Sequence, residues 1–170
     1  MDNLQIISYI VAILTAIVTI YNIRILIKSF RADHERRQKQ ATIEYAAHLL
    51  RECRSTIDAK YKFQPLSEKD IERIKSTPEE EAELRKIMGA IEHLAVGVNT
   101  GVYDKDILYR MSASYIISIY NRMWLFIEYM RKEFSPNAYT ELEYIVKEYE
   151  SSKKGVYKRK SKGEIKYSKE

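Results

Sequence analysis

The sequence predicts an all-α protein with one N-terminal transmembrane helix that continues into a cytoplasmic helical bundle and assembles as an oligomer. Three observations support this fold class. Residues 4–23 contain no Asp, Glu, Lys, Arg or His. Apolar residues recur at helical spacing through most of the remaining chain, and no useful length of strand-like alternation interrupts them. We therefore divide the 170 residues into an anchor at 1–30, a helical domain at 31–150 and a disordered basic tail at 151–170.

The first element, residues 4–23, is long enough to cross a lipid bilayer. At about 1.5 Å per residue it extends roughly 30 Å, which is the thickness of the hydrocarbon layer. A buried core helix is disfavoured because the rest of the chain is too polar to enclose one. A cleavable signal peptide is disfavoured because no Lys or Arg precedes the segment and no small-residue cleavage site follows Ile23. We expect a retained single-pass anchor.

The charges that flank this anchor predict its orientation. Only Asp2 precedes it, whereas residues 24–39 carry six bases and two acids. Because basic residues accumulate on the cytoplasmic side of membrane helices, we expect the N-terminus outside and the helical domain in the cytoplasm. The one cysteine, Cys53, then lies in a reducing compartment. We expect it to be a small buried side chain rather than a disulfide partner or a nucleophile.

Polar residues inside the anchor follow the alternating steps of three and four that mark the a and d positions of a heptad repeat. Together with Ala12, this polar stripe consists of Gln5, Ser8, Thr15, Thr19 and Asn22. Amides and hydroxyls are costly against hydrocarbon, so we expect the stripe to face other copies of the chain or water. Two interpretations stay open: packing in a dimer, or the lining of a narrow pore in a higher oligomer such as a tetramer. The pore would have three bases at its inner mouth: Arg24, Lys28 and Arg31.

The first part of the helical domain is predicted from apolar spacing and helix-start signals. No Gly or Pro occurs in residues 1–64, so the first helix, or two nearly collinear ones, is expected to continue to about Tyr61. Ser67 begins a short helix with a pattern like a capping box. Thr77, which is followed by proline and two acids, begins a longer helix that ends near Gly101.

The second part of the domain is predicted to hold its central helix. Asp104 begins a long, strongly apolar helix that reaches to about residue 130. A second membrane span there is disfavoured, because Arg122 and Glu128 would be buried in lipid. We therefore expect the core helix of a bundle. Ser135, followed by proline, begins the last helix of the domain.

The tail, residues 151–170, combines clustered bases with aromatic residues and lacks apolar periodicity. Basic charge that follows phosphates and rings that stack on bases are typical of single-strand binders. The candidate nucleic-acid-binding residues are Tyr157, Lys158, Arg159, Lys160 and Lys162. A solvated tail, a contact with anionic lipid and a contact with a protein partner remain alternatives.

The chain lacks the spacing patterns that mark common catalytic and metal sites. Its three histidines are His34, His48 and His93, and none belongs to the paired-histidine pattern of a zinc-protease helix. No glycine-rich phosphate-binding loop occurs either. We therefore predict neither an enzyme nor a cofactor or metal site.

The most distinctive motif lies within residues 89–104 and has the form AVGV-x-x-G-x-Y-D, with Tyr115 and Tyr120 on the following helix. On these residues the chain, up to about Glu150, resembles a family of short bacterial proteins with one N-terminal membrane helix and a helical domain of unassigned function. Proteins of this build resemble membrane effectors of anti-phage defence, including the Hailong type. The resemblance implies a bacterial inner-membrane location and an oligomeric channel held shut by single-stranded DNA that a partner nucleotidyltransferase makes.

The leading functional prediction joins this resemblance to the polar stripe and the basic tail. It is a homo-oligomeric, single-pass membrane effector that forms an ion-conducting pore in anti-phage defence. A nucleic-acid or nucleotide ligand, such as single-stranded DNA or an oligonucleotide, gates the pore from the cytoplasmic side. The alternative is a membrane-tethered helical interaction module that localises a partner protein and conducts no ions.

Overall fold

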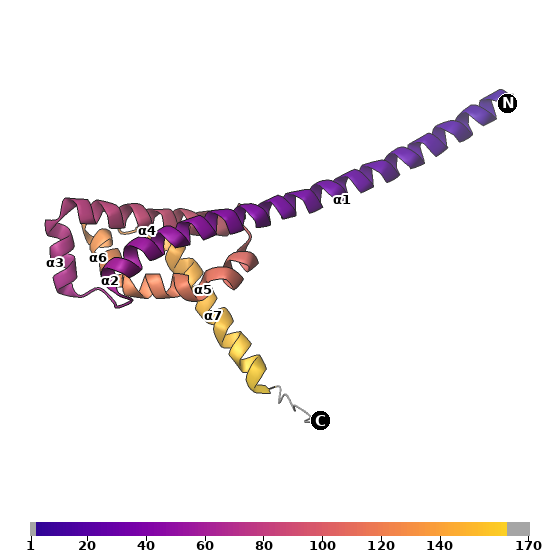
Figure 1. The fold of residues 1–170 in the computed structure, drawn as a ribbon. Coiled ribbons are helices and arrows are strands. Elements are labelled where there is room, and N and C mark those ends of the chain that lie inside the picture. Colours follow the sequence, from indigo (N-terminus) through magenta and orange to yellow (C-terminus); the bar gives the residue numbers. More distant parts are fainter. Residues whose placement is uncertain (1–2, 163–170) are drawn as a thin grey trace. The chain divides into compact units, whose positions relative to one another are not determined.

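The computed structural model describes residues 3–162, with side chains at position 5 and at 10–152, and every regular element in that range is helical (Figure 1). The chain divides after Gln40 into two units. The first unit contains the N-terminal part of helix α1, and the second is a helical bundle. The predicted all-α fold is thus confirmed.

Helix α1, Asn3–Cys53, is a single helix of 51 residues. It runs without a break because its sequence contains no Gly or Pro. Its last residues belong to the bundle, where Ala46, Leu49 and Cys53 are buried. A π-helical turn, η1 (Arg54–Asp58), and the short α2 (Ala59–Tyr61) continue its course. The predicted end near Tyr61 is therefore confirmed, and Lys62 closes α2 with a left-handed φ of 44°.

Two helices follow with the predicted start signals. Helix α3, Glu68–Ser76, begins with a capping box in which the Ser67 hydroxyl accepts from the Asp70 N–H and the Asp70 carboxylate accepts from the Ser67 N–H. Helix α4, Pro78–Asn99, has proline at its first position and three acids in its first turn. Thr77 precedes α4 without a side-chain capping bond.

The predicted long core helix is two helices, α5 (Lys105–Arg122) and α6 (Trp124–Glu133). The break falls at Met123, whose φ and ψ are −91° and 10°. Next to it, the carbonyl of Arg122, the last residue of α5, accepts a hydrogen bond of 3.0 Å from the N–H of the loop residue Leu66. A contact across more than fifty residues of chain therefore divides this segment, and the apolar spacing gave no sign of it.

The last helix, α7 (Thr140–Lys162), begins later than the predicted start at Ser135. Its first turn is capped from another helix: the Glu92 carboxylate accepts from the N–H groups of Glu141 at 3.0 Å and Leu142 at 2.8 Å. A carboxylate at a helix N-terminus satisfies free N–H groups and complements the helix dipole. The backbone of α7 is helical up to Lys162, inside the segment 151–170 that was predicted to be a tail.

The core of the bundle lies where α7 packs against both α4 and α5. Its apolar residues come from every helix of the second unit, as the periodicity predicts. The largest fully buried side chains are Ile57, Ile74, Leu84, Met88, Ile91, Leu94, Leu108, Ile119, Met123, Phe126, Ile127 and Tyr149.

The AVGV-x-x-G-x-Y-D motif forms the turn between α4 and α5 and anchors the end of α1 in the bundle. The ring of Tyr103 packs closely against Gly97, and the Tyr103 N–H donates to the Gly97 carbonyl at 2.9 Å. The same ring stacks on Tyr45 of α1 at 5.3 Å between centroids. Gly101 takes the left-handed φ of 75° that ends α4, and the Asp104 carboxylate caps α5. The motif therefore has a structural explanation.

Replacing Gly97 with alanine should destabilise the bundle, because the new Cβ would overlap Cδ2 and Cε2 of Tyr103. We expect a loss of about 1–3 kcal/mol in the free energy of unfolding. The measurement is urea unfolding of the full chain in detergent, followed by the fluorescence of Trp124, the one tryptophan.

Gly89→Ala on the same helix is the matched control, since nothing lies within 4 Å of its new Cβ. It should stabilise the bundle by about 0.5–1 kcal/mol, because alanine is the better helix former. Equal effects of the two substitutions would contradict the packing of Tyr103 against Gly97.

Candidate functional site

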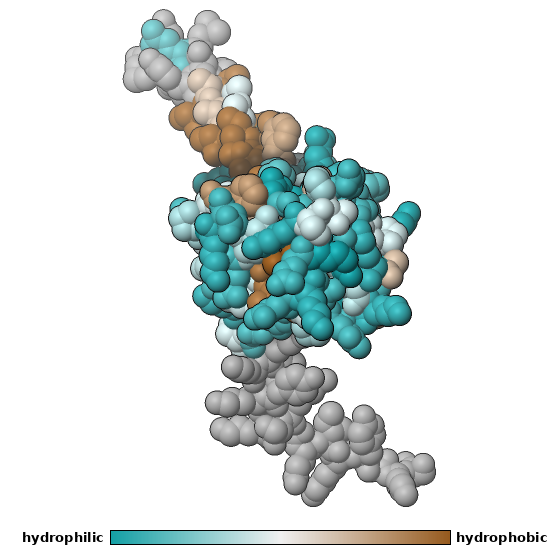
Figure 2. All heavy atoms as spheres, turned by 90° about the vertical axis from the view of Figure 1, so that its left-hand side faces the viewer, coloured by the Kyte–Doolittle hydropathy of each residue, from teal (hydrophilic) through white to brown (hydrophobic). Residues whose placement is uncertain are grey.

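The N-terminal part of α1 carries an apolar surface that no other part of the first unit covers. Within it, an 18-residue window has a mean hydropathy of 2.2 and is not buried at all. Figure 2 shows apolar residues gathered on this helix, whereas the visible surface of the bundle is mainly hydrophilic. Among the described residues, this is the one helix long and apolar enough to span a membrane.

The polar stripe lies exposed on this apolar helix at Gln5, Thr15, Thr19 and Asn22, and the side chain of Ser8 lies outside the described residues. The hydroxyls are satisfied within the helix: Thr15 donates to the Val11 carbonyl and Thr19 to the Thr15 carbonyl, each at 2.8 Å. Such bonds back to the preceding turn are common for threonine in helices. The carboxamides carry two donors and an acceptor each, and so give the stronger reason for contact with a second chain.

The predicted inner-mouth bases Arg24, Lys28 and Arg31 are all exposed. At 3.6 residues per turn they lie roughly 160° around the helix axis from the polar stripe. The helix therefore does not bring these bases onto the face that would line a pore. For the tail, the side chains of Tyr157, Lys158, Arg159, Lys160 and Lys162 lie outside the described residues.

A buried ion pair joins the end of the α1–η1 segment to α5. Arg122 Nη1 donates to Asp58 Oδ1 at 2.6 Å, and the Tyr115 hydroxyl donates to Asp58 Oδ2 at 2.9 Å. The arginine and aspartate side chains are only 5% and 8% exposed. The Phe63 ring lies 5.1 Å from the guanidinium carbon, while Nε and Nη2 find no hydrogen-bond partner among the described residues.

Sequence reasoning did not find this pair. From the sequence, Arg122 was recognised only as a charge that disfavours a second membrane span. The two residues are 64 positions apart, and no spacing rule connects them. Only the general expectation that a buried charge needs a partner could have prompted a search for an acid.

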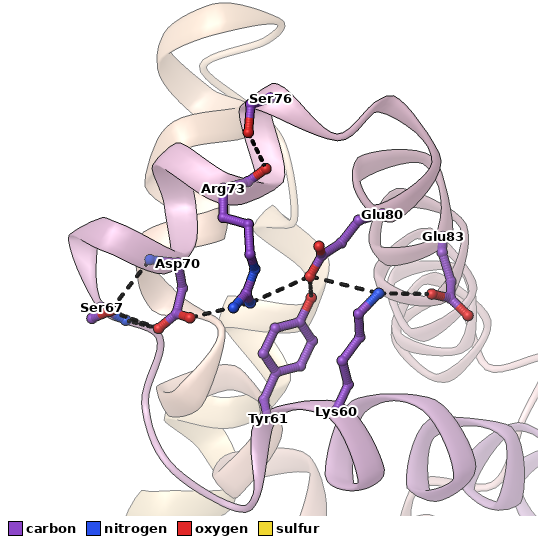
Figure 3. A network of polar contacts seen from close by, with 8 residues as sticks. All are labelled: Lys60, Tyr61, Ser67, Asp70, Arg73, Ser76, Glu80 and Glu83. Carbon is purple, nitrogen blue, oxygen red and sulfur yellow. Dashed lines mark hydrogen bonds and ion pairs between the residues drawn. The ribbon is translucent and has the colours of Figure 1, made fainter.

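A second polar network joins α2, α3 and α4 around the buried carboxylate of Glu80 (Figure 3). Its Oε1 accepts from the Tyr61 hydroxyl at 2.6 Å and from Arg73 at 3.4 Å, and it pairs with Lys60 at 3.6 Å. Lys60 also pairs with Glu83, and Arg73 with Asp70. The bases in this network are thus matched by acids, which makes it a structural joint rather than an open anion site.

The described residues give little support for covalent or metal chemistry. Cys53 is buried, as predicted, and burial raises the pKa of its thiol to about 12, helped by the nearby Glu52 and Asp58 carboxylates. A thiol with this pKa stays protonated at neutral pH and is a poor nucleophile. Between residues 3 and 162, no described group of three His, Cys, Asp or Glu side chains could hold a metal ion.

Arg122→Met should cost about 3–5 kcal/mol of unfolding free energy, because it leaves Asp58 as a buried charge without its cation. Adding Asp58→Asn should recover part of this loss, since asparagine can still accept from Tyr115 and carries no charge. Trp124 fluorescence during urea unfolding of the full chain measures both.

Arg37→Met is the control for this pair. Arg37 pairs with Asp33, but its side chain is 79% exposed. The substitution should therefore lower the free energy of unfolding by less than about 1 kcal/mol. If the double variant Arg122→Met/Asp58→Asn were less stable than Arg122→Met alone, the loss in the single variant would not come from an uncompensated charge on Asp58.

Glu80 should make the stability of the bundle depend on pH. Burial opposes its ionisation, but the Tyr61 hydrogen bond and the Lys60 and Arg73 charges outweigh this and hold the pKa below its ordinary value of 4.5. The stabilisation is therefore complete above pH 4.5 and is lost as the pH falls through the lowered pKa. Glu80→Gln should be less stable than wild type at pH 7, and the gap should close in acid.

Unfolding of the full chain at a series of pH values measures this gap. Glu79→Gln, at an exposed position beside Glu80, controls for the loss of one charge. A gap of constant size from pH 7 to below pH 4 would show that the Glu80 charge does not contribute.

Comparison with known proteins places this architecture in a family. Searches of curated proteins and of solved structures return no match. A family model described as a domain of unknown function, DUF4760, matches residues 9–149. The match includes Thr15, Thr19 and Asn22 of the polar stripe but not Gln5 and Ser8. It also includes the rest of α1 and the bundle up to Tyr149 in α7. The chain therefore belongs to the DUF4760 family.

Proposed function

We propose that this protein is a homo-oligomeric, single-pass effector of the bacterial inner membrane that forms an ion-conducting pore. The observation that carries the proposal is the polar stripe on α1, set on a helix whose other residues from Ile10 to Ile23 are apolar and exposed. Amide groups in a bilayer gain from hydrogen bonds between helices, so the stripe favours a symmetric assembly around itself. An assembly of several copies would enclose a path lined by the stripe, with Gln5, Ser8, Thr15, Thr19 and Asn22 along it.

The bundle is the proposed sensor of the pore. One helix, α1, carries both the polar stripe and the residues that are buried in the bundle, such as Ala46 and Cys53. A ligand that binds one state of the bundle better than another would shift the equilibrium of the assembly. We propose a nucleic-acid or nucleotide ligand, because the tail from residue 151 is rich in bases and tyrosine. The resemblance to anti-phage effectors suggests a partner nucleotidyltransferase as its source.

A second candidate function is a membrane tether that localises a partner protein. It is favoured by the hydroxyls of Thr15 and Thr19, which already donate to carbonyls of their own helix and so need no second chain. A tether would have no conduction path, and its anchor could stand alone in the bilayer. The two functions therefore differ in both assembly and current.

Thr15→Leu combined with Thr19→Leu should abolish conductance while the protein still inserts and assembles. Leucine side chains on the stripe would narrow the path and exclude water, which closes a pore without any structural gate. The measurement is single-channel current from the purified full chain in planar bilayers, with the mass of the detergent-solubilised assembly determined in parallel.

Ile13→Leu with Ile17→Leu is the matched control, with the same spacing and the same new residue on the other side of α1. Its current should equal that of wild type. A conducting Thr15/Thr19 variant would count against a pore lined by the stripe. Lone chains without current in the wild type would favour the tether.

A further inference from the structure

A second ordered series runs along α1, separate from the polar stripe. It repeats in steps of four and three, so that its members follow one side of the helix. In order, they are Ile10, Leu14, Ile17, Tyr21, Arg24, Lys28 and Arg31. The four apolar members are between 52% and 63% exposed, and the three bases are exposed as well. We call this series the outer face of α1.

The outer face lies opposite the polar stripe. In the heptad frame that places the stripe at positions a and d, every member of the outer face falls at c or f, which face away from the seam. In any assembly closed around the stripe, the outer face would therefore point away from the other copies and toward lipid. Among the described residues, Arg24, Lys28 and Arg31 form no ion pair, whereas Arg37 farther along pairs with Asp33 at 2.8 Å.

The types of side chain along the outer face follow the same order as the layers of a bilayer. Three branched aliphatic residues come first, then a tyrosine, then three bases. Aliphatic side chains suit the hydrocarbon layer, and tyrosine concentrates where hydrocarbon meets the headgroups. Arg24, Lys28 and Arg31 lie roughly 5, 10 and 15 Å beyond Tyr21 along the axis. Long basic side chains can reach back toward the headgroups, so all three come within range of lipid phosphates.

We propose that Arg24, Lys28 and Arg31 form a binding surface for the phosphates of anionic phospholipids in the leaflet next to the bundle. The inference rests on the proposed membrane span, but it requires neither a pore nor a particular number of subunits. It gives these bases a role at the outside of the assembly in place of the inner mouth. Their charge then holds the depth and rotation of α1 in the bilayer.

The test compares how strongly the full chain prefers anionic over zwitterionic lipid. The protein is reconstituted in phosphatidylcholine vesicles with spin-labelled phosphatidylglycerol or spin-labelled phosphatidylcholine. The motionally restricted fraction gives the relative association constant. One basic residue near an anionic surface contributes a factor of about five, so the wild type should prefer phosphatidylglycerol at least about fivefold.

The variant R24Q/K28Q/R31Q should lose this preference, with a ratio near one. The control R36Q/R37Q/K39Q removes the same charge roughly 15 Å farther along the axis and should keep the wild-type ratio. An unchanged ratio in the first variant, or an equal loss in both, would overturn the proposal.

A soluble phosphate source is tested by adding glycerol phosphate. It should displace none of the bound phosphatidylglycerol, and displacement would identify a soluble ligand and overturn the lipid assignment. The lipid ratio is measured without any current. The lipid preference can therefore be measured even if the protein forms no pore. Channel currents can likewise be measured even if the bases bind no lipid.

Discussion

The unbroken backbone hydrogen bonding of α1 is the constraint on which the rest of the structure depends. In hydrocarbon each peptide group must be satisfied within its own segment, and a helix without Gly or Pro does so along its whole length. The same helix ends as a core element of the bundle, where Ala46, Leu49 and Cys53 are buried. This one continuous element therefore joins the apolar segment to the bundle.

Three side-chain joints are among the contacts that hold α1, η1 and α2 in the bundle. The ring of Tyr103 packs against Gly97 and stacks on Tyr45, Asp58 pairs with Arg122, and the Glu80 carboxylate accepts hydrogen bonds from α2 and α3. Each joint connects segments that are distant in sequence, and two of them depend on buried charge. At the two charged joints, an arrangement of helices that separated the partners would leave a buried charge without compensation, which is strongly destabilising.

Local patterns predicted much of this fold. The unbroken N-terminal helix, the capping box at Ser67, the proline start of α4 and the glycine end at Gly101 all follow from the conformational preferences of single residues or short motifs. The break at Met123 and the late start of α7 were not predicted, because a distant N–H and a distant carboxylate decide them. The polar stripe was visible in the sequence, but the Asp58–Arg122 pair was not, since it exists only once the helices have packed.

The burial of Cys53 has a practical consequence for watching the bundle move. The chain contains one cysteine, and its thiol is both covered and protonated while the bundle is closed. A maleimide can react with it only when the contact between the end of α1 and the other helices opens, as amide exchange reports local unfolding elsewhere. The alkylation rate of Cys53 in the unmodified protein thus reports how often the contact between the end of α1 and the other helices opens. A ligand that loosens or tightens the bundle would change that rate without any added label.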